Sequence, residues 1–271
     1  MKKQCIYRVA VIIFLAFSLY CRGQEKEDNK DYQYALIEAV KQKNLGSISE
    51  AVKLYRLVIK DKPDCDVAYF ELGNIYLMSK QIELATENLE KAYLLDRDNK
   101  WYFMAYLNAL GAGEQFDTMI KILKEKVKND QEEVEWEYQL ATVYFSKGKD
   151  GKAIRILERI EKERGFSEKI TLLKASVYEN EEKFDLARQE IVKVMELFPE
   201  AIQFRIVAAE LSLKSGKEDE AAEYYQQILE MDSTNIFALT NLTDYYRKKE
   251  DFKKSFQYLI RSFDNELIDL K

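Results

Sequence analysis

The chain has 271 residues, carries a net charge of −6 and contains no histidine. An acidic chain without a basic stripe is a poor binder of nucleic acids and anionic membranes. The missing histidine removes the commonest general base and metal ligand, and nine glycines with two prolines argue against a turn-rich β architecture. We therefore expect an all-α, non-catalytic protein with no metal site and no cofactor.

The first 23 residues have the pattern of a secretory signal peptide. Three basic residues precede an apolar run, Val9–Tyr20. This run is shorter than the ~20 residues needed to cross a bilayer, but it suits the core of an export signal. Small residues at Cys21 and Gly23 favour cleavage after Gly23, with cleavage after Ser18 as the second candidate. We expect export across the inner membrane, to the periplasm or the cell envelope.

Lipidation of Cys21 is an alternative to cleavage after Gly23. Cys21 would become the lipid-bearing first residue of a lipoprotein, although the bulky Tyr20 departs from the small residue expected before it. Removal of residues 1–23 takes away four basic and no acidic residues, which changes the net charge from −6 to −10. Only Cys65 then remains, so no internal disulfide can form.

Residues 24–31 (QEKEDNKD) are polar and are expected to form a short flexible lead. From residue 32 onward the chain repeats itself with a period of 34 residues, a feature that decides the fold when it is present. One position is small in nearly every copy, and it is occupied by Ala51, Ala85, Met119, Ala153, Ala187, Ala221 and Ser255. The position four residues later is occupied by Tyr55, Leu89, Leu123, Leu157, Ile191, Tyr225 and Leu259.

A second pair of columns lies in the first half of each period. The small column consists of Ala39, Gly73, Leu107, Ala141, Ala175, Ala209 and Thr243. The larger column consists of Gln42, Tyr76, Leu110, Tyr144, Tyr178, Ser212 and Tyr246. A small residue where two helices cross lets their backbones approach closely, and a larger residue one turn away fills the space beside it. The columns predict two packed helices in each period.

These residue types and this period resemble the tetratricopeptide repeat (TPR), a 34-residue helix–turn–helix, and residues 66–99 form its clearest copy. The resemblance covers about residues 32–269, as seven units that start at 32, 66, 100, 134, 168, 202 and 236. It implies an all-α, right-handed α-solenoid of seven repeats, similar to exported bacterial TPR proteins. Stability in such an array accrues from stacking of neighbouring repeats.

The third unit departs from the pattern. Leu107 and Met119 replace two small residues, and Gly111-Ala112-Gly113 is expected to shorten the first helix of this unit. We predict looser or differently angled packing here, as in a hinge; local repacking around the flexible Met119 is the alternative.

The seventh unit lacks a full capping helix, and residues 270–271 read as the start of a further helix. Terminal repeats normally present a polar outer face. The sequence therefore suggests that the chain is the front part of a longer array, or that a partner associates with its uncapped C-terminal repeat.

The resemblance places a ligand groove on the face formed by the first helices. The apolar and amide side chains carried over to it are Phe70, Asn74, Leu77, Trp101, Met104, Asn108, Tyr138, Phe145 and Leu172. Phe70 and Met104 stand where some TPR cochaperones have the lysines that grip a carboxylate tail, so this ligand class is not supported. The aromatic residues suit an interface core, and the asparagines suit the backbone of an extended peptide. The alternative is that these side chains pack between neighbouring helices.

The sequence thus predicts a non-catalytic interaction scaffold or adaptor that binds a protein or peptide segment. The alternative is the sensory or regulatory N-terminal portion of a longer signalling protein. A cluster of acidic residues, Glu132, Glu133, Glu135 and Glu137, is interpreted as a solvated face rather than a metal site.

Overall fold

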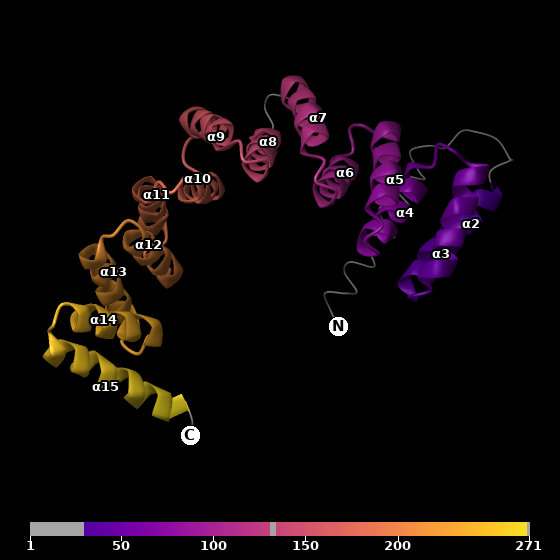
Figure 1. Cartoon of the computed structure of the whole chain (residues 1–271). Coiled ribbons are helices and arrows are strands. Elements are labelled where there is room, and N and C mark those ends of the chain that lie inside the picture. The colour runs from indigo at the N-terminus through magenta and orange to yellow at the C-terminus, as the bar shows by residue number, and fades with distance from the viewer. Residues whose placement is uncertain (1–29, 131–133, 270–271) are drawn as a thin grey trace. The chain divides into compact units, whose positions relative to one another are not determined.

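The computed structural model of the chain describes residues 30–130 and 134–269. These residues form fourteen α-helices and no strand. Figure 1 labels the helices along the chain. The all-α solenoid of seven helix–turn–helix repeats expected from the sequence is confirmed. Several expectations concern residues outside the described part of the chain. They are the signal peptide (residues 1–23) with Cys21, nearly all of the lead (residues 24–31) and the start of a further helix (residues 270–271).

The helices follow one another in seven pairs of similar length. The pairs are α2 (Lys30–Asn44) with α3 (Ile48–Asp61), α4 (Asp66–Met78) with α5 (Ile82–Leu95), α6 (Lys100–Ala112) with α7 (Phe116–Asn129), α8 (Val134–Ser146) with α9 (Asp150–Arg164), α10 (Glu168–Asn180) with α11 (Phe184–Leu197), α12 (Ile202–Lys214) with α13 (Glu218–Met231) and α14 (Ile236–Lys248) with α15 (Phe252–Asp269). None of the described helices has the length and apolar composition required to cross a membrane.

The chain divides into two compact units, and the boundary lies between Gln115 and Phe116. Unit 1 contains α2 to α6, and unit 2 contains α7 to α15. The boundary therefore falls inside the third repeat, between its first and second helices. The hinge suggested for this repeat by its sequence stays a prediction.

The same backbone turn joins the two helices of every repeat. In the second repeat the N–H of Gln81 donates to the carbonyl of Tyr76 at 2.9 Å, and the N–H of Lys80 donates to that of Leu77 at 3.0 Å. This pair of bonds is the Schellman motif, which satisfies the last carbonyls of a helix with one residue in the left-handed conformation. The left-handed residues, 34 apart, are Gly46, Lys80, Glu114, Gly148, Glu182, Gly216 and Glu250.

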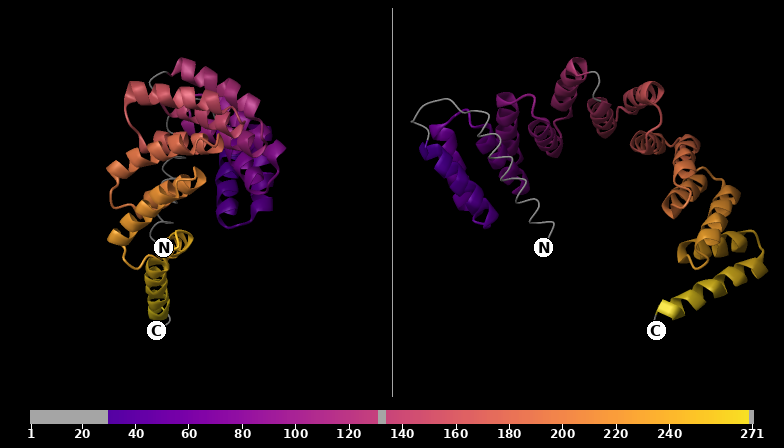
Figure 2. Two further views of the ribbon diagram at one scale, coloured as in Figure 1. Left: turned by 60° about the vertical axis from the view of Figure 1, so that its left-hand side comes forward. Right: turned by 180° about the vertical axis from the view of Figure 1, so that it is seen from behind.

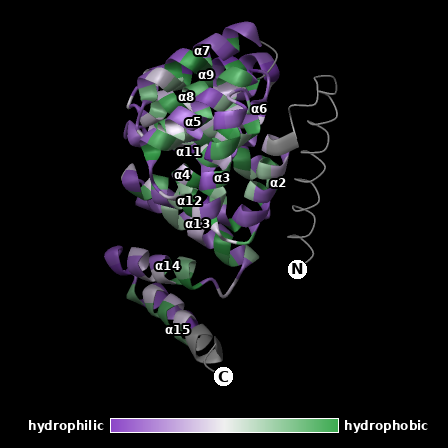
Figure 3. Cartoon of the chain, turned by 90° about the vertical axis from the view of Figure 1, so that its right-hand side faces the viewer, coloured by the Kyte–Doolittle hydropathy of each residue, from purple (hydrophilic) through white to green (hydrophobic). Residues whose placement is uncertain are grey.

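Close approach of paired helices explains the small columns of the sequence. A Cβ atom added to Gly73 in α4 would lie 2.5 Å from Cγ of Leu89 in α5, closer than real side-chain atoms lie. Leu89 itself is fully buried, as are Ala85 and Ala92 on the same helix. Figure 3 shows that hydrophobic and hydrophilic residues are interleaved along the helices.

The expectation of a shortened first helix in the third repeat is wrong. Helix α6 spans 13 residues and ends at Ala112, the same length as α4 and α8. A glycine inside a helix costs about 1 kcal/mol relative to alanine, and burial of Ala109 and Leu110 beside Gly111 outweighs it. The helix then ends in the same turn as its counterparts, with the N–H of Gln115 bonded to the carbonyl of Leu110 at 2.8 Å.

A buried charge cluster joins three helices of unit 2. Lys174 of α10 is only 4% exposed, and its Nζ lies 2.7 Å from Glu161 of α9 and 2.8 Å from Glu190 of α11. Lys193 lies 3.0 Å from Glu190 at the edge of the cluster. Burial acts to lower the pKa of Lys174, but hydrogen bonds and attraction from Glu161 and Glu190 outweigh it and raise that pKa above its ordinary value. Burial acts to raise the pKa of Glu161, but hydrogen bonds and attraction from Lys174 and Lys193 outweigh it and lower that pKa.

Two glycines three residues apart should respond oppositely to alanine. Gly148 has φ +67°, where an L-residue is disfavoured by roughly 1–2 kcal/mol, so Gly148→Ala should lower the free energy of unfolding by about 1 kcal/mol. Gly151 lies in α9 with open space around it, so Gly151→Ala should raise it by roughly 0.5–1 kcal/mol. Urea unfolding followed by circular dichroism measures both. Equal effects of the two substitutions would contradict the assigned turn.

Replacement of Lys174 by methionine should destabilise the protein at neutral pH. It leaves the buried carboxylate of Glu190 with only Lys193, and we expect a loss of roughly 2–3 kcal/mol, below the ~3–5 kcal/mol of a pair broken without a substitute. The pKa of Glu161 is lowered in the folded state, so its contribution is present above the ordinary value of 4.5 and is lost as the pH falls through the folded pKa. The difference between wild type and Lys174→Met should therefore shrink on acidification. Chemical denaturation between neutral and acidic pH tests this, and a pH-independent difference would refute it.

Candidate functional site

Unit 1 places its share of the predicted groove residues on two neighbouring first helices. Phe70, Asn74 and Leu77 lie on α4, and Trp101, Met104 and Asn108 lie on α6. The two helices are in contact. The ring of Phe70 is half-buried against the ring of Tyr102, with centroids 4.9 Å apart. Phe70 therefore helps to hold α4 against α6, as the packing alternative predicted for these side chains.

Trp101 is the most exposed of these aromatic residues, with 73% of its surface accessible. It lies in the first turn of α6, where the side chain of Asn99 accepts hydrogen bonds from the N–H groups of Trp101 at 3.0 Å and Tyr102 at 3.4 Å. This cap satisfies two N–H groups that the helix cannot pair. Asn108 follows seven residues later, two turns along the same side of α6, and is also exposed.

Asn74 and Asn108 occupy equivalent positions, 34 residues apart on α4 and α6. Neither side chain forms a hydrogen bond within the part of the chain that the structure describes. A carboxamide offers both a donor and an acceptor. Unit 1 therefore presents two unoccupied amides, with Trp101 and the half-buried Met104 and Leu77 as apolar neighbours.

Tyr102 lies behind this surface and is almost fully buried. Its hydroxyl donates to Asp66 at 3.4 Å. Burial raises the pKa of Tyr102 well above its ordinary value, and the negative charge of Asp66 adds to the effect. The phenol therefore stays neutral at physiological pH and acts as a packing element.

The predicted residues of unit 2 are more involved in its own structure. Lys169 of α10 places its Nζ 3.9 Å from the ring centroid of Tyr138 on α8, and the same amine pairs with Glu135 at 2.9 Å. Leu172 packs against the apolar cluster of α10, α11 and α12. Phe145 is half-buried at the end of α8. The unoccupied amide pair, Asn74 and Asn108, therefore belongs to unit 1.

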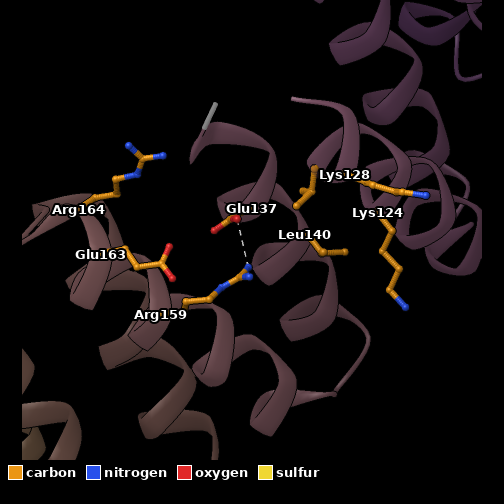
Figure 4. A pocket seen from close by; sticks show the side chains of 8 residues that line it. Lys124, Lys128, Glu137, Leu140, Arg159, Glu163 and Arg164 are labelled. Atoms are coloured by element: carbon orange, nitrogen blue, oxygen red, sulfur yellow. Dashed lines mark ion pairs between the residues drawn. The ribbon is translucent and has the colours of Figure 1, made fainter. Parts of the chain in front are cut away.

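Sequence reasoning missed a cleft in unit 2. It has a volume of about 600 Å³ and lies along α7, α8 and α9. Figure 4 shows Arg159 paired with Glu137 inside it, while Lys124 and Lys128 point away from that pair. The cations therefore do not converge on one point. None of the four columns described for the 34-residue pattern marks the cleft. Its lining residues are Lys124, Val127, Lys128, Glu137, Leu140, Arg159, Glu163 and Arg164.

The site chemistry offers no arrangement for a metal. Among the described residues no three Cys, Asp or Glu side chains gather closely enough to hold an ion. Glu132 and Glu133 of the acidic cluster lie outside the described residues. Cys65 is buried and forms no disulfide among the described residues.

Comparisons with known proteins agree with the repeat architecture. Models of the family described as tetratricopeptide repeat match residues 67–99 and 172–236, and neither match is to an enzyme domain. The chain is similar to the C-terminal part of a TPR repeat-containing protein from Cytophaga hutchinsonii, with 18% identity, a TM-score of 0.66 and coverage of 86% of this chain and 95% of that one.

A second similar structure is a tetratricopeptide repeat protein from Parabacteroides merdae. It shares 11% identity and a TM-score of 0.59, with 86% of this chain and 92% of that chain covered. At these identities the likeness concerns the fold. The comparison with curated proteins yielded no match.

Proposed function

We propose that this chain, which matches models of the tetratricopeptide repeat at residues 67–99 and 172–236, is a non-catalytic scaffold that binds an extended polypeptide segment on the α4–α6 surface of unit 1. Tetratricopeptide repeats generally bind proteins or peptides. The observation that carries the proposal is the pair of unoccupied amides, Asn74 and Asn108, on consecutive first helices. An extended peptide has unpaired N–H and C=O groups, which such amides can bond.

The apolar neighbours of the amides supply the remaining contact. Trp101 is exposed and is held at a capped helix start, so it can cover a ligand side chain without first being released from a core. Aromatic side chains that become buried when a ligand binds often supply much of the binding energy of an interface. The ring of Phe70 already packs on Tyr102, so its contribution is to hold α4 in place beside α6.

We further propose that the protein is exported. The support is the sequence of residues 1–23, with its basic start, apolar run and small residues at Cys21 and Gly23. Export would place the scaffold in the cell envelope, where its polypeptide ligand would be another exported protein.

A photo-crosslinking amino acid at Trp101 should capture the bound segment in cells that make the protein. The same amino acid at Leu57, which is exposed on the second helix α3 of unit 1, is the matched control. Once a segment is identified, Asn74→Ala and Asn108→Ala should each weaken its binding about tenfold, because each removes bonds worth roughly 1–1.5 kcal/mol. Equal capture at Trp101 and Leu57, or unchanged affinity in both alanine variants, would refute the proposal.

Processing of the N-terminus tests export separately. Mass spectrometry of the protein isolated from its own cells should find Gln24 as the first residue, as expected for cleavage after Gly23. The variant Cys21→Ser should be processed in the same way. A lipid-sized mass on Cys21 that this variant abolishes would show the lipoprotein route instead, and an intact Met1 would refute export.

A further inference from the structure

The two helices of the α4–α6 surface carry very few charges. Helix α6 contains no charged residue within Trp101–Ala112, and α4 contains only Asp66 and Glu71. The side chain of Glu71 is 15% exposed, and its carboxylate pairs with Nζ of Lys43 on α2 at 2.6 Å. Asp66 accepts a hydrogen bond from the buried phenol behind the surface. A ligand at this surface therefore meets mainly apolar side chains and amides.

The lack of charge distinguishes α4 and α6, which Figure 2 shows in purple from two further sides, from the other five first helices. On each first helix, four residues at steps of three, four and three lie on one side. On α4 and α6 they form the neutral side, which consists of Val67, Phe70, Asn74 and Leu77 on α4 and of Trp101, Met104, Asn108 and Gly111 on α6. The equivalent positions of α2, α8, α10, α12 and α14 include at least one charged residue in each helix: Lys43, Glu135, Lys169, Glu179, Glu210, Asp244 and Arg247. The absence of charge is therefore a property of these two helices and not of the repeat as such.

We propose that the neutral side of α4 and α6 selects polypeptide segments without charged side chains, a specificity that rests on the binding function proposed above. A ligand side chain that contacts this side loses water. An acidic or basic side chain would then find no opposite charge on the neutral side to replace its hydration. An uncharged side chain avoids this cost, and an apolar one can cover the exposed ring of Trp101. Asp98 and Lys100, which are exposed beside Trp101, have opposite signs and favour neither class of charged ligand.

The amides Asn74 and Asn108 fit the same class of ligand. A carboxamide donates and accepts hydrogen bonds without a net charge, so it can bond the backbone of any segment. Four periods later the same two positions are occupied by Glu210 on α12 and Asp244 on α14. A carboxylate only accepts hydrogen bonds, and it attracts lysine and arginine side chains. The choice of amide over carboxylate therefore decides which class of segment α4 and α6 select.

The test is the selection of short peptides from a random phage-displayed library on the full-length protein. Peptides that lose binding to Trp101→Ala are the ones held by the α4–α6 surface. Their sequences should contain Asp, Glu, Lys and Arg at well below the frequencies of the unselected library. Replacement of the apolar residue that each peptide needs for binding by either lysine or glutamate should weaken binding about tenfold or more in fluorescence anisotropy.

The variant Asn108→Asp should change the selected class. It keeps the shape of the side chain and adds one negative charge, so the selected peptides should gain lysine and arginine. A peptide with lysine at the critical position should bind this variant about tenfold more tightly than it binds the wild type. Asp244→Asn makes the reverse change at the equivalent position of α14, and as the matched control it should leave the selected class unchanged. Asn108 is exposed, so Asn108→Asp should fold as the wild type does, and circular dichroism checks this.

The results separate this specificity from the proposed function. Trp101-dependent peptides that are rich in acidic or basic residues would overturn the specificity and leave peptide binding by the α4–α6 surface in place. An unchanged selected class with Asn108→Asp would overturn the role of the amides in the specificity. Absence of any Trp101-dependent peptide would overturn the proposed function and the specificity with it.

Discussion

The structure depends on the close approach of two helices at a small residue in most of the repeats. Gly73 and the alanines at equivalent positions let paired backbones meet, and a larger side chain such as Leu89 then fills the space one turn away. At Gly73 an added Cβ atom would lie 2.5 Å from Leu89 and would push α4 and α5 apart unless Leu89 shifted. Because each pair relies on the next for burial, the spacing of 34 residues is a condition of stability and not only a record of duplication.

Much of this architecture could be predicted from the sequence, because helix crossings demand small residues and a period keeps them aligned. The third repeat shows the limit of such reasoning. Gly111 lowers local helix propensity, yet burial of Ala109 and Leu110 keeps α6 at full length. The left-handed conformation of Lys80, Glu114, Glu182 and Glu250 could not be predicted from the sequence either. Lysine and glutamate have no preference for it, and the main-chain bonds of the turn impose it.

The candidate site was partly predictable for a different reason. Residue type indicated which side chains could face a ligand, but only the structure separates Trp101, which is free, from Phe70, which packs on Tyr102. In unit 2, Lys169 lies over Tyr138, a contact between different repeats that no single copy of the motif encodes. Surface availability depends on these neighbours, so it cannot be read from a column of aligned residues.

The turns have one more consequence. Each Schellman turn is closed by main-chain bonds, as between Gln81 and Tyr76, so the side chain at its left-handed position has no structural duty. Three of these positions are glycine, and the others are lysine or glutamate. These turn positions therefore accept residues of different type, glycine, lysine or glutamate, as long as the backbone can take the left-handed conformation. In engineering terms these positions, 34 residues apart in the sequence, are regularly spaced attachment points for labels.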